Sequence, residues 1–233
     1  MQIGHPHLHF RSIGSTNTEA SRLAADGARS GTLVTSDGQT SGRGRQGRPW
    51  STPEGALAYS VVLRGMIEVP GTLPLQVGVA VCEAVESLGV EQAQVKWPND
   101  IWIEGRKVAG ILVEARPQDG WAVIGIGLNV STATEEFPEE VRDRATSVGH
   151  GATFREAIEA LNLSLGHRLD CPVDQTLDEF ARRDGLLGRP VSWELGSGTA
   201  AGIDERGNLL VDASNGDLVT LNAGEVHLDV AAG

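Results

Sequence analysis

The pattern of apolar positions along the chain predicts several helices between many short strands. Apolar residues three or four positions apart predict a helix over 74–88, which ends before Gly89. The same spacing predicts a long helix over 153–169 and a shorter one over 177–183. Each of these helices has an apolar face, so each is expected to pack on a common core.

Capping-box patterns mark the beginnings of two predicted helices. Thr16 is followed three residues later by Glu19, and Thr153 is followed in the same way by Glu156. The first pattern predicts a short helix that begins at Thr16 and ends at Gly27. The second pattern predicts the beginning of the long helix.

Runs of apolar residues predict strands in the same part of the chain. These strands are expected at 8–12, 32–36, 56–64, 93–97, 101–103, 108–115 and 121–130. Only short turns separate the last four strands, and such separations are typical of hairpins. The pattern therefore predicts an α+β fold with an antiparallel or mixed sheet, and it argues against repeated βαβ units.

The pattern changes after Gly188, where short strands follow one another without helices. The predicted strands are 190–195, 199–204, 208–212, 218–222 and 226–230. Five short strands in so few residues indicate a small β-barrel. We therefore predict two domains, a larger one over 1–187 and the barrel over 188–233.

Composition narrows the function classes. The 233 residues include 19 Lys and Arg and 31 Asp and Glu, which gives a net charge of −12. Such an acidic chain is a poor general binder of nucleic acid, and we expect no helix-turn-helix domain, because the segment before the first predicted strand is too short for one. Two cysteines make no disulfide framework, and Cys82 fits a helix core. We find no signal peptide and no membrane-spanning run, so we expect a cytoplasmic protein without membrane partners.

The most unusual stretch of the chain is Gly42–Trp50, in which three arginines alternate with three glycines. Gly42, Gly44 and Gly47 match the dinucleotide pattern G-x-G-x-x-G, but no helix follows, so a Rossmann site is not expected. Arginine offers planar, permanently charged donors for phosphate and carboxylate. The stretch is therefore either a solvated basic loop or an anion-binding loop.

Two polar positions precede this loop. The segment Gly14–Asn17 includes Ser15 and Thr16, and it can be a simple helix cap or can offer N–H groups and hydroxyls to a polar ligand. Gln39 lies just ahead of the arginine loop, where it is either solvated or a ligand contact.

Three later segments carry further candidate groups. In Lys96–Asp100, a turn explains the Pro-Asn-Asp part, while Lys96 can meet a phosphate and Asp100 can hold a hydrated Mg²⁺. Lys107 opens an apolar strand, so it is a solvated edge charge or points into a pocket. In Gly125–Val130, glycines permit close approach of a ligand and Asn129 provides a polar end. No motif for a protein nucleophile is found, and cations around anions fit adenylation, in which a carboxylate attacks ATP.

Four of these motifs, in this order and spacing, resemble those of biotin–protein ligases. They are Gly42–Arg48, Lys96–Asp100, Lys107–Leu112 and Gly125–Asn129. The resemblance implies a catalytic domain of the class II synthetase-like biotin/lipoate ligase type and a C-terminal SH3-like barrel. It also implies an enzyme that uses biotin, ATP and Mg²⁺ to form biotinyl-5′-AMP. The biotinyl group then passes to a lysine of a biotin carboxyl carrier protein.

The resemblance also implies roles for individual residues. Those expected to contact biotin are Ser15, Thr16, Asn17, Gln39, Arg43, Gly44, Arg45 and Lys107. Those expected on the ATP or adenylate side are Arg43, Arg45, Arg48, Trp50, Lys96, Asn99, Asp100, Lys107 and Asn129. Lys107 and Arg45 are the expected catalytic residues, and Asp100 is the candidate metal ligand. Gln46 departs from the family, whose members often have a basic residue there.

Two alternative functions stay open at this point. A lipoate–protein ligase or octanoyltransferase relative would share the fold, although the Arg-Gly-Arg loop and the Lys-Trp-Pro-Asn-Asp run favour biotin. A non-catalytic biotin-binding regulator would need lost phosphate ligands or an added DNA-binding module. A homodimer is possible, since family members form dimers through sheet edges.

Overall fold

The computed structural model describes residues 1–65, 71–222 and 226–228. The helices are α1 (Thr16–Ala25), α2 (Leu73–Ser87), α3 (Phe154–Arg168) and α4 (Val173–Arg183). The strands of the first part are β1 (His7–Phe10), β2 (Leu33–Ser36), β3 (Ala56–Arg64), β4 (Gln94–Lys96), β5 (Asp100–Ile103), β6 (Arg106–Arg116) and β7 (Trp121–Asn129). Those of the last part are β8 (Pro190–Trp193), β9 (Gly196–Ile203), β10 (Leu209–Ala213), β11 (Leu218–Leu221) and β12 (His227–Leu228).

Within the described residues, the first part forms a seven-stranded sheet in the order β1-β2-β3-β7-β6-β5-β4. Strands β1 and β2 are parallel, and the other neighbouring pairs are antiparallel. The prediction of an α+β fold with a mixed sheet is therefore confirmed. Its long central strands, β3, β6 and β7, are paired over eight or more positions, and this rigid centre carries the candidate site.

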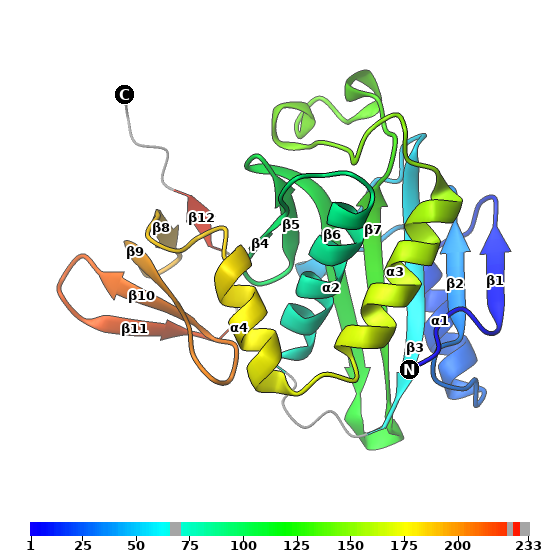
Figure 1. Ribbon diagram of the computed structural model, residues 1–233, viewed down its shortest axis with the longest axis horizontal. Helices are drawn as coiled ribbons and strands as arrows, with labels where there is room; N and C mark the ends of the chain where they lie inside the picture. The colour runs from blue at the N-terminus through cyan, green and yellow to red at the C-terminus, as the bar shows by residue number, and fades with distance from the viewer. Residues whose placement is uncertain (66–70, 223–225, 229–233) are drawn as a thin grey trace.

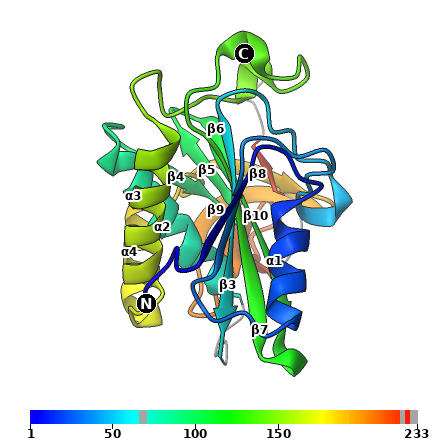
Figure 2. The same cartoon turned by 90° about the vertical axis from the view of Figure 1, so that its right-hand side faces the viewer.

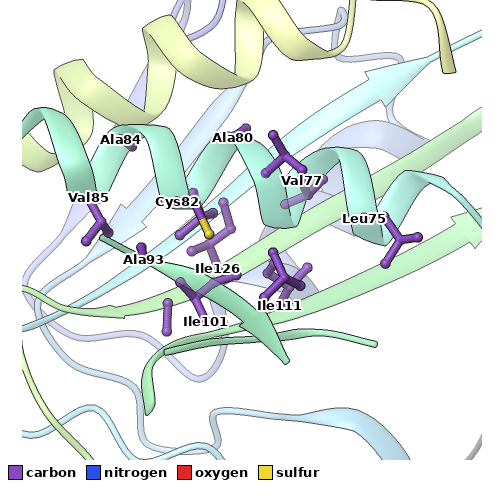
Figure 3. Close-up of a cluster of buried hydrophobic side chains, with 14 of the residues drawn as sticks. Leu75, Val77, Ala80, Cys82, Ala84, Val85, Ala93, Ile101, Ile111 and Ile126 are labelled. Atoms are coloured by element: carbon purple, nitrogen blue, oxygen red, sulfur yellow. The ribbon is translucent and has the colours of Figure 1, made fainter. Parts of the chain in front are cut away.

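Helices cover both faces of this sheet, as Figure 2 shows with α1 on one side and α2 and α3 on the other. The apolar side chains of α2 pack on the sheet, among them Leu75 and Cys82 against Ile111 and Ile126 (Figure 3). Burial of each large aliphatic side chain contributes about 1.5–3 kcal/mol. The face under α2 is thus the main core, and the smaller apolar cluster under α1 leaves part of that face to polar groups.

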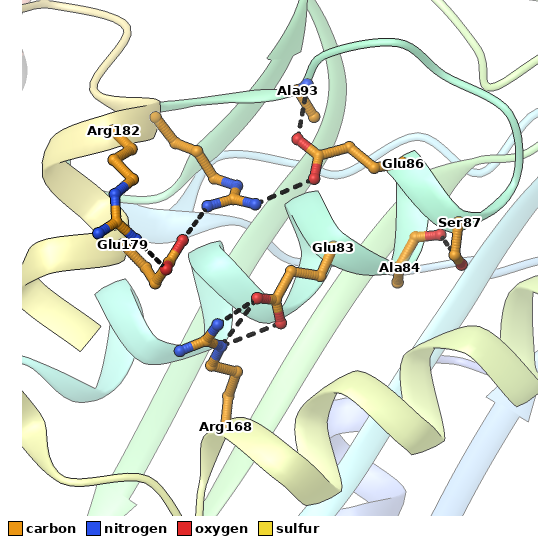
Figure 4. Close-up of polar contacts among 9 residues, drawn as sticks. Glu83, Ala84, Glu86, Ser87, Ala93, Arg168, Glu179 and Arg182 are labelled. Carbon is orange, nitrogen blue, oxygen red and sulfur yellow. Dashed lines mark hydrogen bonds and ion pairs between the residues drawn. The ribbon is translucent and has the colours of Figure 1, made fainter. Parts of the chain in front are cut away.

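Ion pairs join α2 to the two later helices (Figure 4). Arg168 of α3 is paired with Glu83, and this carboxylate raises the pKa of the guanidinium. Arg183 of α4 donates to Glu86 at 3.1 Å and to Glu179 at 2.5 Å. These partly buried pairs fix α3 and α4 against α2, and α4 leads into the last part of the chain.

The last part forms a five-stranded antiparallel sheet in the order β11-β10-β9-β8-β12 within the described residues. This small sheet is consistent with the expected SH3-like fold, and it lies beside α4 and β4 (Figure 1). The expected strand at 226–230 is described only over β12, and residues 229–230 lie outside the described residues. The boundary at residue 187 falls between α4 and β8 and stays a prediction.

The structure corrects the beginning of α1. Ser15, and not Thr16, is the N-cap, and its hydroxyl accepts a hydrogen bond from Thr18 N at 3.5 Å. Glu19 is bonded to Arg22 instead of closing a capping box. The spacing of Thr16 and Glu19 was misleading because Ser15 supplies an equivalent hydroxyl one residue earlier.

The other helix boundaries agree with the sequence or differ by a few residues. The capping box of Thr153 and Glu156 is present at the beginning of α3. Helix α4 begins at Val173, four residues before the predicted range, because the polar residues 174–176 separate Val173 from the apolar positions that mark the helix. No helix in the described part of the chain has the length and apolar character needed to cross a bilayer.

Candidate active site

The candidate site lies on the α1 face of the sheet, over three glycines of adjacent strands. Gly110 of β6 is opposite Gly127 of β7, and Gly125 lies two residues from Gly127 on the same face. A Cβ atom at Gly127 would lie 2.2 Å from Cε2 of Trp50, and one at Gly125 would lie 2.1 Å from Oδ1 of Asn17. We call these three residues the glycine floor. Because these residues have no side chains, the Trp50 ring and the Asn17 amide pack directly on the sheet backbone.

The first turn of α1 closes one end of the glycine floor with buried, uncharged polar groups. Ser15, Thr16 and Asn17 are each no more than 6% exposed. Gln39 Oε1 accepts hydrogen bonds from Thr16 N at 2.9 Å and Thr16 Oγ1 at 3.2 Å. Ser60 Oγ lies 2.8 Å from Thr16 Oγ1 and donates to Asn17 Oδ1 at 2.6 Å. The structure thus brings together four of the residues expected to contact biotin.

A carboxylate completes this polar end. Glu114 of β6 accepts a hydrogen bond from Asn17 Nδ2 at 2.8 Å and is paired with Arg43 at 3.2 Å. Arg43 also donates to Thr18 Oγ1 at 3.3 Å. The first arginine of the loop is therefore connected to the polar end of the site through one acidic side chain.

The arginine loop is folded down over the glycine floor. Gly44 N donates to Arg48 O at 2.7 Å, and Trp50 N donates to Gly42 O at 2.9 Å, so the loop closes on itself. Gln46 takes up a left-handed conformation with φ 55° at the tip. Arg48 lies on the exposed part of the loop. Backbone bonds at its base hold the loop and leave the arginine side chains to reach other elements.

Trp50 and Lys107 meet over the glycine floor. Lys107 Nζ lies 5.4 Å from the centroid of the Trp50 ring, within the range of a cation–π contact. The same ammonium lies 2.6 Å from Asp100 Oδ1. Trp50 Nε1 is buried, and no partner for it is found among the described residues. The lysine is therefore aimed inward from the beginning of β6 and is not a solvated edge charge.

The turn between β4 and β5 supplies the other polar groups at this cationic end. Arg45 donates to Asn99 Oδ1 at 3.0 Å, so the second arginine of the loop reaches this turn. Lys96 is opposite Asp100 in the register of β4 and β5, and its Nζ lies 5.3 Å from the Trp102 ring. Arg45, Lys107 and Lys96 therefore lie around residues 99–100, at one end of the glycine floor.

Asn129, the last residue of β7, is connected to Lys107 through Thr146. Its Nδ2 donates to Thr146 O at 3.0 Å, while Thr146 N donates to Lys107 O at 2.9 Å. Asn129 thus helps to hold the segment that supports Lys107, and it is only 5% exposed. Its expected contact with the adenylate stays a prediction.

The site also contains two residues that the sequence analysis did not select. Ser60 is a fully buried hydroxyl in β3, and Glu114 lies near the end of β6. The signal for Ser60 was a polar residue inside an apolar strand. The signal for Glu114 was its position four residues after Gly110 in the same strand, because residues an even number of positions apart in a strand lie on one face.

The comparisons with known proteins agree with this arrangement. Residues 9–131 match the biotin/lipoate A/B protein ligase family, and residues 186–229 match the biotin protein ligase C terminal domain. The chain therefore belongs to the biotin/lipoate A/B protein ligase family.

The relatives within this family are biotin protein ligases. The chain is 36% identical to the bifunctional ligase/repressor BirA of Bacillus spizizenii, over 90% of this chain and 70% of that protein. It is 36% identical to the biotin--[acetyl-CoA-carboxylase] ligase of Mycobacterium tuberculosis, over 92% of this chain and 86% of that protein. A biotin protein ligase from Aquifex aeolicus, in complex with biotin and ATP, has a TM-score of 0.82 and 29% identity. That alignment covers 95% of this chain and 97% of the other, and the resemblance inferred from the motifs is confirmed.

Proposed function

We propose that the protein catalyses biotinylation in two steps at the glycine floor. A carboxylate oxygen of biotin attacks the α-phosphorus of ATP, which gives biotinyl-5′-AMP while pyrophosphate leaves. A neutral lysine amine of a biotin carboxyl carrier protein then attacks the acyl carbon. An amide forms, AMP leaves with the bonding electron pair, and the amine loses a proton.

The observation that carries this proposal is the difference in polarity between the two ends of the site. One end offers the amides and hydroxyls of Thr16, Asn17 and Gln39, and the charges of Glu114 and Arg43 beside them are paired with each other. The other end offers the cations Lys107 and Arg45, with the carboxylate of Asp100 next to Lys107. Gly125 and Gly127 lie between them, a separation of about 7 Å along an extended strand. Biotin has a neutral ureido ring, an apolar four-carbon chain and a terminal carboxylate, in the same order.

The cationic groups suit adenylation because the negative charge of the reacting phosphate must be balanced. We assign Lys107 to the biotin carboxylate and to the α-phosphate oxygens, since it points over the floor from a rigid strand. We assign Arg45 to the adenylate, since the loop brings it to the same end. Arg43, Gly44, Arg48 and Trp50 then cover the intermediate and exclude water, which protects a mixed anhydride from hydrolysis.

The residues on the ATP side fit a nucleotide with bound Mg²⁺. Magnesium in such sites is held by one or two carboxylates together with substrate phosphates, and Asp100 is the carboxylate at this end. No cluster of three or more His, Cys, Asp or Glu residues that could hold a metal is found in the described parts of the chain. Magnesium bound there would neutralise phosphate charge. We assign Lys96, Asn99 and Asn129 to the phosphate and nucleotide.

Lipoate is a weaker candidate substrate than biotin. Its dithiolane ring has no ureido group, so it could make no hydrogen bonds to Asn17 or Gln39, which are paired with neighbouring protein groups in this structure. A ligand that covers buried polar groups without bonding to them binds less well than one that hydrogen-bonds to them. A regulator that only binds biotin could use Lys107 for the biotin carboxylate, but it would have no use for a second cation, Arg45, at the same end.

The partner in this proposal is a biotin carboxyl carrier protein. Because ATP is a substrate, we expect the reaction to take place in the cytoplasm. We expect no part for nucleic acid, given the net charge of −12. A homodimer stays a prediction, and its natural surface is the edge strand β1, whose side chains are half-buried or exposed.

One experiment separates these functions. The protein is incubated with Mg-ATP and either biotin or lipoate, and the acyl-AMP is detected by mass spectrometry. We expect the mass of biotinyl-AMP. Formation of lipoyl-AMP alone would assign the protein to the lipoate branch, and formation of neither compound would rule out the enzymatic proposal.

A further inference from the structure

Trp97 makes a hydrogen bond that reaches from the candidate site into the last part of the chain. Its indole N–H donates to the carbonyl oxygen of Gly207 at 2.9 Å, and the bond is buried. Trp97 itself is only 2% exposed. None of the roles assigned above uses this residue, although it belongs to the Lys96–Asp100 segment. A buried bond across 110 residues indicates that the position of one segment depends on the other.

The turn that carries Gly207 is built to hold its carbonyl in place. The Asp204 carboxylate accepts hydrogen bonds from Arg206 N at 2.9 Å, from Asn208 N at 2.9 Å and from Asn208 Nδ2 at 2.8 Å. Burial alone would raise the pKa of Asp204, but these bonds and the nearby Arg206 charge lower it. The turn between β9 and β10 is therefore rigid and polar.

Close packing fixes this turn against the beginning of α2. Gly207 has a left-handed conformation with φ 80°, and a Cβ atom there would lie 2.9 Å from Gly71 O and 3.0 Å from Leu75 Cδ1. A Cβ atom at Gly71 would lie 2.6 Å from Arg206 O. Two glycines thus allow the backbones of the two parts to meet, and Trp97 lies at this contact.

On the other side of Trp97, the chain leads directly to the cationic end of the site. Asn99 binds Arg45, and Asp100 binds Lys107, so residues two and three positions after Trp97 hold both proposed catalytic groups. A second tie lies just before it, where Gly185 N donates to Val95 O at 2.9 Å. The segment 95–97 is therefore hydrogen-bonded to later parts of the chain at two residues, Gly185 and Gly207.

We propose that Trp97 is a positioning residue for adenylation. Its bond to Gly207 lets the turn at 204–208 fix Asn99 and Asp100, and through them Arg45 and Lys107. This inference rests on the proposed function only for its kinetic consequence. Its structural part, that Trp97 holds the Asn99 turn in register with β6, holds for the protein without substrates.

The decisive variant is Trp97→Phe, which keeps an aromatic ring and removes the N–H donor. We expect the rate of biotinyl-AMP formation to fall about 10- to 100-fold, the range for small misplacements of catalytic groups. We expect the dissociation constant for biotin alone to change less than about threefold, because the polar end of the site is not involved. The matched control is Trp121→Phe, a buried substitution of the same kind at the far end of β7, expected to keep the adenylation rate.

A second measurement needs no activity. Ile111 N donates to Asn99 O at 2.9 Å, so the exchange rate of this amide reports the position of the turn. Hydrogen exchange followed by NMR is expected to accelerate at Ile111 in Trp97→Phe and to stay unchanged in Trp121→Phe. Asp204→Ala, which disrupts the turn from the other side, is expected to accelerate the same amide.

The outcomes separate this inference from the proposed function. If the wild-type protein forms no biotinyl-AMP, the proposed function fails, and the exchange of Ile111 still decides the structural part. If Trp97→Phe adenylates biotin at the wild-type rate, or if Ile111 exchange is unchanged, Trp97 is not a positioning residue. The double variant Trp97→Phe/Asp204→Ala is expected to be no slower than the slower single variant. If the fold reductions of the adenylation rate in the two single variants multiply in the double variant, the turn at 204–208 does not act through Trp97.

Discussion

Substitution of Gly125 by alanine tests how tightly the first turn of α1 is fitted to the glycine floor. A Cβ atom at Gly125 would lie 2.1 Å from Oδ1 and 2.8 Å from Cγ of Asn17. Atoms do not approach this closely, so the Asn17 side chain must leave its place. It then loses its bonds to Ser60 at 2.6 Å and to Glu114 at 2.8 Å.

The magnitude follows from these two bonds. Asn17 is 5% exposed and Ser60 is fully buried, so water cannot readily replace the lost partners. Each unsatisfied buried group costs about 1–3 kcal/mol, and the gain from alanine over glycine in a strand offsets about 0.5–1 kcal/mol. We therefore expect the free energy of unfolding to fall by about 1–5 kcal/mol. For a chain of this size the melting temperature should fall by about 2–20 °C.

A double-mutant cycle identifies the clash as the cause. Urea unfolding is measured for Gly125→Ala, Asn17→Ala and the double variant, with Gly151→Ala as the control, because a Cβ there meets nothing within 4 Å. Removal of the Asn17 amide leaves room for the new methyl group. We expect the double variant to be no less stable than Asn17→Ala alone. If the two losses of stability simply add, the alanine acts elsewhere and the close fit is not what matters.

Three further predictions concern charged groups. Lys107→Met should slow pyrophosphate release about 10²- to 10³-fold with an unchanged thermal transition, and a lost transition would instead show a structural role. Glu114→Gln removes the charge that pairs with Arg43 but keeps an acceptor, so biotin dissociation in stopped-flow competition should rise by up to about fivefold. That difference should shrink at high salt, and salt independence would argue against the ion pair. Burial raises the pKa of Asp184, so its ionised form is disfavoured in the folded state, and Asp184→Asn should be more stable than wild type at pH 7. The two urea midpoints should converge as the pH falls to about 3, and a gap that widens would contradict this sign.

Much of the fold could be predicted from the sequence because its elements have strong local signals. The strand at 56–64 and the helix after Pro74 are apolar runs with clear periods, and the short turns around Asn99 predicted antiparallel neighbours. The parallel pair of β1 and β2 could not be predicted. This pairing depends on the crossover connection through α1. The period of apolar residues predicts that a strand is present, but it does not predict which strand lies next to it.

The candidate site was predicted from motifs, but not its connections. Lys107 was identified as a possible pocket residue, yet its partners Asp100 and Trp50 depend on strand register and on how the loop folds. The same limit applies to Trp97, whose partner lies far along the chain in a turn with no chemical signal of its own. Side chains that act through distant backbone atoms leave little trace in a single sequence.

The central claim is that neutral polar groups hold the biotin ring and that cations hold its activated carboxylate over the glycine floor. A crystal structure with a non-hydrolysable analogue of biotinyl-AMP tests this claim most directly. We expect the ureido ring beside Thr16 and Asn17, the acyl phosphate within hydrogen-bond distance of Lys107, and Trp50 in contact with the ligand. An analogue bound away from Gly125 and Gly127, or with its phosphate remote from Lys107, would contradict the account.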